Sequence, residues 1–151
     1  MCRRARAGST RVVDDREPTV DPLLPSPIEL ALPGDSRFMR LARLMASGVA
    51  TACGLPLEEV EDFRVVVDEV CATLIEAGGG APIRLVFRID KGCLVVAGTT
   101  QAIGHLGPDE DRLALSHQIL DVVTDSHDFS RGPNGDVSFV AATRLRGSGV
   151  G

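Results

Sequence analysis

One carboxylate falls where a solvated acid is not expected. Glu69 lies in the middle of a helical pattern, close to Val66 and Val70. It belongs to a stripe whose members recur at three- and four-residue spacing and therefore share one helix face. A partly buried carboxylate there is a candidate functional group, whereas an exposed Glu on the solvent side of the helix is the competing interpretation. The stripe comprises Asp62, Val66, Glu69, Thr73 and Glu76.

Serine and histidine are adjacent at Ser116-His117 and Ser126-His127, and both residue types take part in the catalytic triads of hydrolases. Adjacent residues rarely face each other, and the nucleophile-elbow pattern Gly-x-Ser-x-Gly does not occur in the sequence. Core or surface histidines explain the same residues without a catalytic triad, so this interpretation is the weakest. The residues concerned are Ser116, Ser126, Ser130, His105, His117 and His127.

The four cysteines do not indicate a metal site. Cys2, Cys53, Cys71 and Cys93 are widely spaced, form no Cys-x-x-Cys pair and have no close histidine partner. Zinc sites and disulfide frameworks need close, patterned ligands. We therefore predict no metal and expect all four thiols to be reduced.

Composition excludes several classes of protein. The chain has 151 residues, a formal net charge of −5 and a single lysine, Lys91, in a predicted turn. It therefore contains no phosphate-loop Gly-Lys-Ser/Thr, and Schiff-base chemistry would have to use Lys91. An acidic chain with five Phe and neither Trp nor Tyr lacks the basic groove and stacking aromatics of single-stranded nucleic-acid binders. We expect no direct contact with nucleic acid.

The sequence carries no sign of export or membrane insertion. Its basic N-terminus is followed by no apolar stretch of the kind found in a secretory signal. No run approaches the roughly 18 apolar residues of a membrane span. We expect a cytoplasmic protein with no membrane partner.

Hydrophobic periodicity predicts the element order β-α-α-β-β-α-β-β, which is typical of an α+β two-layer sandwich with a mostly antiparallel sheet and helices on one face. Composition divides the chain into a flexible tail (1–27), a domain (28–146) and a frayed end (147–151). The expected segments are a strand at 28–33, helices at 35–54 and 56–80, a hairpin at 83–98, a loop at 99–108, a helix at 109–123 and a hairpin at 125–145.

The first predicted helix has an apolar stripe and an arginine face. The arginines, Arg37, Arg40 and Arg43, form either a solvated stripe or a contact surface for an acidic partner. The predicted apolar stripe comprises Phe38, Leu41, Ala42, Met45, Val49 and Ala52.

Two segments carry a resemblance to a known family. They are Leu41-Ala-Arg-Leu-Met-Ala-Ser-Gly-Val-Ala50 and the stretch from Cys53 to Thr73, which contains Glu-x-Glu-Asp followed seven residues later by Glu69. This run resembles the first two helices of bacterial anti-sigma factors, the serine-protein kinases of stress-response and sporulation switches in the GHKL ATPase superfamily. The resemblance extends over roughly residues 28–146. It implies the histidine-kinase-like ATPase fold, a sigma factor and an anti-anti-sigma factor as partners, and a homodimer.

The resemblance also implies an ATP site, and its three motifs are altered here. Glu69 aligns with the catalytic Glu, but Thr73 stands where the family has a magnesium-binding Asn. Gly98 and Thr100 stand where the family has the Asp and Gly of its adenine-binding motif. The glycine-rich phosphate motif aligns with Arg112-Leu-Ala-Leu115, so that Leu113 and Ala114 fall in a loop that needs glycine.

Three altered motifs lead to one expectation. We expect an anti-sigma factor that sequesters its sigma factor with weak or no kinase activity and no cofactor. The alternative is an active serine-protein kinase that uses Glu69 as base and binds ATP and Mg²⁺ in a divergent pocket.

Overall fold

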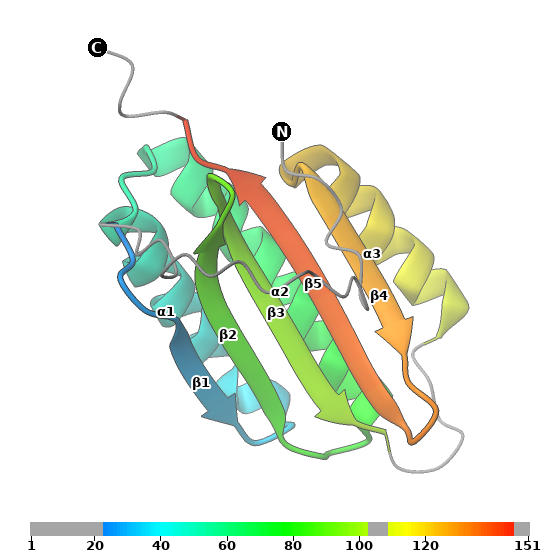
Figure 1. The fold of residues 1–151 in the computed structure, drawn as a ribbon. Helices are drawn as coiled ribbons and strands as arrows, with labels where there is room; N and C mark the ends of the chain where they lie inside the picture. The colour runs from blue at the N-terminus through cyan, green and yellow to red at the C-terminus, as the bar shows by residue number, and fades with distance from the viewer. Residues whose placement is uncertain (1–22, 103–108, 147–151) are drawn as a thin grey trace, which may run out of the picture.

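The computed structural model describes residues 23–102 and 109–146, which form a five-stranded sheet covered by three α-helices (Figure 1). In chain order the elements are β1 (Ile28–Leu32), a 3₁₀ turn (Ser36–Phe38), α1 (Met39–Ala52), α2 (Leu57–Gly78), β2 (Ile83–Asp90), β3 (Cys93–Gln101), α3 (Glu110–Val123), β4 (Ser126–Arg131) and β5 (Asp136–Arg144).

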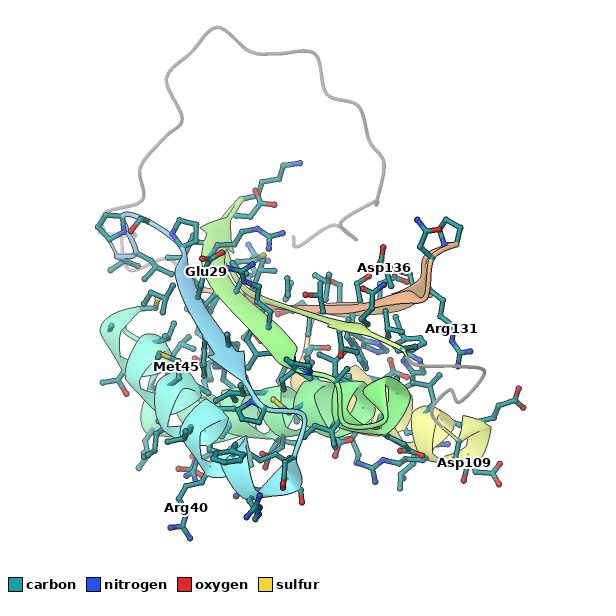
Figure 2. The ribbon with its side chains drawn as sticks, turned by 90° about the horizontal axis from the view of Figure 1, so that it is seen from below. Glu29, Arg40, Met45, Asp109, Arg131 and Asp136 are labelled. Carbon is teal, nitrogen blue, oxygen red and sulfur yellow. The ribbon has the colours of Figure 1, made fainter. Side chains whose placement is uncertain are left out.

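The sheet has the strand order β1-β2-β3-β5-β4, and every neighbouring pair is antiparallel. All three helices lie on one face of this sheet, so that the molecule seen from below has two layers (Figure 2). The predicted α+β sandwich and the predicted element order are confirmed.

The central helix of the layer is α2, which packs across β3 and β5 with α1 on one side and α3 on the other. Pro56 precedes its first turn with an extended backbone, and Gly79 ends it at a φ of +56°, a conformation that favours glycine. Its buried apolar side chains include Val60, Phe63, Val67, Val70, Cys71 and Leu74.

Two local predictions were wrong. The apolar stripe of α1 consists of Ala42, Ala46, Val49 and Ala50, whereas Leu41 is 47% exposed. Small side chains let α1 approach α2 closely, and the larger leucine is left outside. Residues 99–101, predicted as loop, continue β3 because Thr99, Thr100 and Gln101 pair with β5.

Two further observations concern the core and the cysteines. Leu24, which precedes β1, is 9% exposed and packs in the core. Cys53 and Cys71 are both buried, and burial raises the pKa of the Cys71 thiol to about 12. Cys93 is disulfide-bonded, so the expectation of four reduced thiols is wrong for this residue. Among the described helices none is both long and apolar enough to span a bilayer.

Candidate functional site

Glu69 lies on the face of α2 that packs against α3. Its Oε2 accepts a hydrogen bond of 2.6 Å from the Ser116 hydroxyl, which comes from α3 and is 1% exposed. A hydrogen bond to an ionised acceptor is stronger than one between neutral groups. The carboxylate is therefore engaged by the neighbouring helix, and the stripe predicted from spacing faces α3.

A second carboxylate of the same stripe holds the beginning of α3. Glu76 Oε1 accepts from the backbone N–H of Asp109 at 3.0 Å, and Glu76 Oε2 forms an ion pair with Arg112 at 2.8 Å. Both oxygens of Glu76 thus bind α3. Together with the Ser116 contact, these bonds fasten the first two turns of α3 to α2.

The N-terminus of α3 is strongly acidic. Asp109 caps the helix, because its Oδ1 accepts from the Asp111 backbone N–H at 3.2 Å, and Glu110 and Asp111 occupy the first turn. A helix N-terminus attracts anions through its free N–H groups and its dipole. Here carboxylates from Glu76 and Asp109 already take two of those N–H groups, and the surrounding negative charge disfavours a phosphate.

Thr73 lies between Glu69 and Glu76 along the stripe but is not accessible. It is 1% exposed, and its hydroxyl has no hydrogen-bond partner within residues 23–102 and 109–146. A side chain this buried offers its one oxygen to no ion arriving from solvent in this structure.

Gly98 and Thr100 lie on the face of β3 that is covered by α2. A Cβ at Gly98 would stand 2.5 Å from Leu74 Cδ1 and 2.9 Å from Val70 Cγ1. The Thr100 hydroxyl donates to the Pro82 carbonyl at 2.9 Å. Both positions therefore serve the packing of α2 on the sheet, and no side chain at position 98 has room to reach a ligand.

The two positions expected to align with the family's phosphate motif, Leu113 and Ala114, both lie in α3. Leu113 is half-buried and packs against the core, and Ala114 is exposed. Their backbone is helical, so it does not form a glycine-type loop around an anion. Neither position therefore supplies the glycine-type phosphate loop that the resemblance implies.

The three arginines of the predicted partner surface differ in their contacts. Arg37 pairs with Asp35 at 2.9 Å, and Arg43 pairs with Asp68 of α2 at 2.7 Å. Arg40 forms no ion pair with any described residue and extends from the outer side of the helix layer (Figure 2). Of the three, Arg40 has the charge most available to a partner.

A hydrolase triad needs a hydrogen bond between a serine and a histidine, and none occurs in the part of the chain that is described. Ser116 donates to Glu69, Ser130 pairs with Ser138 at 2.7 Å, and His117 pairs with His127. His105 lies outside the described residues.

A cleft of about 470 Å³ lies at the other end of the helix layer. It is formed by the start of α2, the end of α3 and the end of β5, and Glu59, Asp125 and Arg144 are among its lining residues. None of the predicted site residues lines it.

The sequence predicted which face of α2 carries the candidate site, but not the residues of α3 that this face contacts. Glu76 was recognised as a member of the stripe, yet its two bonds to α3 were not predicted, and Ser116 was considered only as a hydrolase nucleophile. Ser116 is 47 residues from Glu69, so no local spacing relates them. The available signal was Arg112, a cation in the first turn of the third helix that can pair with an acid of the stripe.

The chain is an α+β sandwich protein. Carboxylates of α2 bind α3, and both helices lie over an antiparallel sheet. Within that class the chain is similar over about a third of its length to bacterial proteins named serine-protein kinase RsbW. It is 33% identical over 52 residues to the Halalkalibacterium halodurans protein, a match that covers 34% of this chain and 32% of that relative. It is 35% identical over 49 residues to the Bacillus pumilus protein and 33% identical over 49 residues to that of Bacillus subtilis.

The similarity is confined to part of each relative. The match covers 30% of the Bacillus pumilus protein and 31% of the Bacillus subtilis protein. No model of a known protein family matches the sequence.

Proposed function

We propose that this protein is an anti-sigma factor of the GHKL type that binds and sequesters a sigma factor, is displaced by an anti-anti-sigma factor, and has lost the kinase activity of its relatives. The similarity to serine-protein kinases named RsbW and the α+β fold support the family. In this proposal the protein is cytoplasmic and acts as a homodimer.

The observation that carries the loss of kinase activity is the start of α3. In a GHKL kinase this helix end must receive phosphates, whereas here Glu76, Asp109, Glu110 and Asp111 surround it. Unlike a glycine-rich loop, it presents carboxylates to an incoming triphosphate, and like charges repel. Glu69 then serves to hold Ser116 and not as a base.

The surface proposed for the partner is the outer side of α1. Arg40 is unpaired among the described residues, and its neighbours Leu41 and Leu44 are 47% and 65% exposed. Exposed apolar side chains beside an available cation suit a partner surface that combines apolar and acidic residues.

Co-purification tests the partner directly. The full chain, tagged and expressed in its own host, is expected to retain a sigma factor and, in a separate complex, an anti-anti-sigma factor, both identified by mass. Recovery of the chain without either protein would contradict the proposal. Light scattering of the free protein is expected to give the mass of two copies.

Nucleotide is expected to leave the melting temperature unchanged. A ligand at 100 times its Kd stabilises a fold by about 2.7 kcal/mol, which raises Tm by roughly 5–10 °C for a chain of this size. We expect no such rise with millimolar Mg-ATP, because the residues at the start of α3 disfavour phosphate. The Bacillus subtilis serine-protein kinase RsbW is the positive control. A comparable rise in both proteins, together with phosphate transfer to the anti-anti-sigma factor, would favour the active kinase instead.

Charge reversal at Arg40 is expected to weaken sigma-factor binding without destabilising the fold. Arg40→Glu should raise the Kd by about tenfold or more, which corresponds to roughly 1.4 kcal/mol, because an exposed cation would be replaced by a repelling anion. Arg40→Lys keeps the charge and is the matched control. Equal affinities of the Glu and Lys variants, measured by titration calorimetry, would rule out this surface.

A further inference from the structure

Two histidines face each other where α3 meets β4. His117 of α3 and His127 of β4 approach with their Nδ1 atoms 3.0 Å apart, and the ring centroids are 4.9 Å apart. The other ring nitrogen of His127, Nε2, lies 2.6 Å from Asp121 Oδ1. Asp121 comes one turn after His117 on the same helix. These side chains form a continuous hydrogen-bonded chain that the proposed function does not use.

The contact between the two Nδ1 atoms limits how many protons the histidine pair (His117 and His127) can hold. A ring nitrogen either donates or accepts a hydrogen bond, so a contact of this length needs one nitrogen of each kind. When His127 is neutral and donates from Nε2 to Asp121, its Nδ1 accepts and His117 donates. When His127 is protonated, its Nδ1 donates and His117 accepts in its other tautomer. When both rings are protonated, both Nδ1 atoms carry hydrogen and the contact becomes repulsive.

The surroundings of His117 favour its neutral form. Burial is the main cause that lowers the pKa of His117, and the nearby His127 adds to it, whereas Asp121 and Asp128 act in the opposite direction. On β5 the ring of Phe139, which is uncharged, lies 5.9 Å from His117.

Asp121 and Asp128 are the negative charges that act on the pair, and the other described groups packed nearby are already engaged. On α2, Glu69 is engaged by Ser116. On β4, Arg131 lies over the ring of Phe129 at 5.9 Å. No group of three metal-ligating side chains occurs in the part of the chain that the structure describes, so the pair lacks a third ligand for a metal ion.

We infer that the histidine pair is a pH-sensitive contact: it holds the C-terminal half of α3 on β4 as long as at least one ring is neutral, and acidification that charges both rings releases that half of the helix.

Stability depends on pH because the folded and unfolded states of the chain bind protons to His117 with different affinities. Because the folded state lowers the pKa of His117, the unfolded chain binds more protons between that lowered value and the ordinary value of 6.5. The stabilising contribution of His117 is therefore fully present above pH 6.5 and is lost as the pH falls below it. This holds whether or not the protein binds a sigma factor.

Nuclear magnetic resonance of the full chain with ¹⁵N-labelled histidine tests the inference without any variant of the pair. His105→Gln simplifies the spectrum. We expect uptake of the second proton by the pair to coincide with shifts of the backbone amides in residues 117–123 and 126–128. Hydrogen-exchange protection of residues 118–123, corrected for intrinsic rates, should then fall by up to about tenfold per pH unit, as expected for an opening linked to one proton.

The matched variant is His117→Asn. Its amide can donate to or accept from His127 Nδ1 and does not titrate in this range. Protection in α3 should therefore lose most of its pH dependence in the variant. The inference is overturned if both rings of the unmodified pair become charged while α3 stays protected. Equal pH dependence in the His117→Asn protein, provided it folds, would also overturn it.

Discussion

Replacing Gly98 with aspartate is expected to destabilise the protein by more than about 4 kcal/mol, and so to leave much of it unfolded at moderate temperature. The new Cβ would stand 2.5 Å from Leu74 Cδ1, 2.9 Å from Val70 Cγ1 and 3.1 Å from Leu85 Cδ2. Overpacking alone costs about 1–3 kcal/mol, and a carboxylate buried without a partner adds several more. Chemical denaturation followed by circular dichroism measures the loss.

Thr99→Asp is the matched control for Gly98→Asp. Thr99 is the next residue of β3, is exposed and lies on the opposite face of the sheet, so the same carboxylate remains hydrated there. We expect a change below about 1 kcal/mol, the range of strand preferences. Similar stability of the two variants would mean that α2 does not close over Gly98. A large difference would show that position 98 does not accommodate the aspartate that the family resemblance leads one to expect there.

Ser116→Ala is expected to cost about 1–3 kcal/mol, the range for removing a hydrogen bond to a charged group in a partly buried place. The change would leave Glu69 Oε2 without the hydroxyl that donates to it at 2.6 Å. Thermal unfolding should show this as a decrease in Tm of roughly 2–10 °C. Gln118→Ala, at an exposed position on the same helix, is the control and should change Tm little.

A double-mutant cycle separates the Ser116–Glu69 bond from general effects of the substitutions. Glu69→Gln keeps the shape of the side chain and removes its charge. If the bond stabilises the fold, Ser116→Ala should cost less in the Glu69→Gln background than in the original chain. Equal costs in both backgrounds would indicate that the hydrogen bond contributes nothing to stability, and that α3 is held by packing and Glu76 alone.

The order of the elements and their layers was predictable because each element has a strong local signal. The alternation of Ile83, Leu85 and Phe87 defines β2, and a proline before and a glycine after α2 define its ends. Leu41 was misplaced because periodicity alone favours a large apolar residue for the core, whereas α1 uses alanines there. The end of β3 was missed because Thr99 and Thr100 gain their regularity from pairing with β5, which lies 37 or more residues further on.

The contacts of the candidate site were less predictable than its face. Spacing on α2 placed Glu69, Thr73 and Glu76 on one side, and that side does meet α3. The partners of Glu69 and Glu76 come from a helix more than 30 residues away, so the pairing depends on tertiary structure. The histidine pair was hidden for a related reason: adjacent Ser-His dipeptides suggested catalysis, while the contact that forms joins the two histidines across a turn.

Glu76 also bears on how the chain can evolve. Both of its carboxylate oxygens bind α3, one through the Asp109 backbone and the other through Arg112. A gain of phosphate affinity at this end of α3 would require the helix start to lose negative charge, and replacing Glu76 first would remove both bonds that fix it. Such a step would therefore lower stability before any affinity for phosphate is gained. Stability thus constrains which substitutions the start of α3 tolerates.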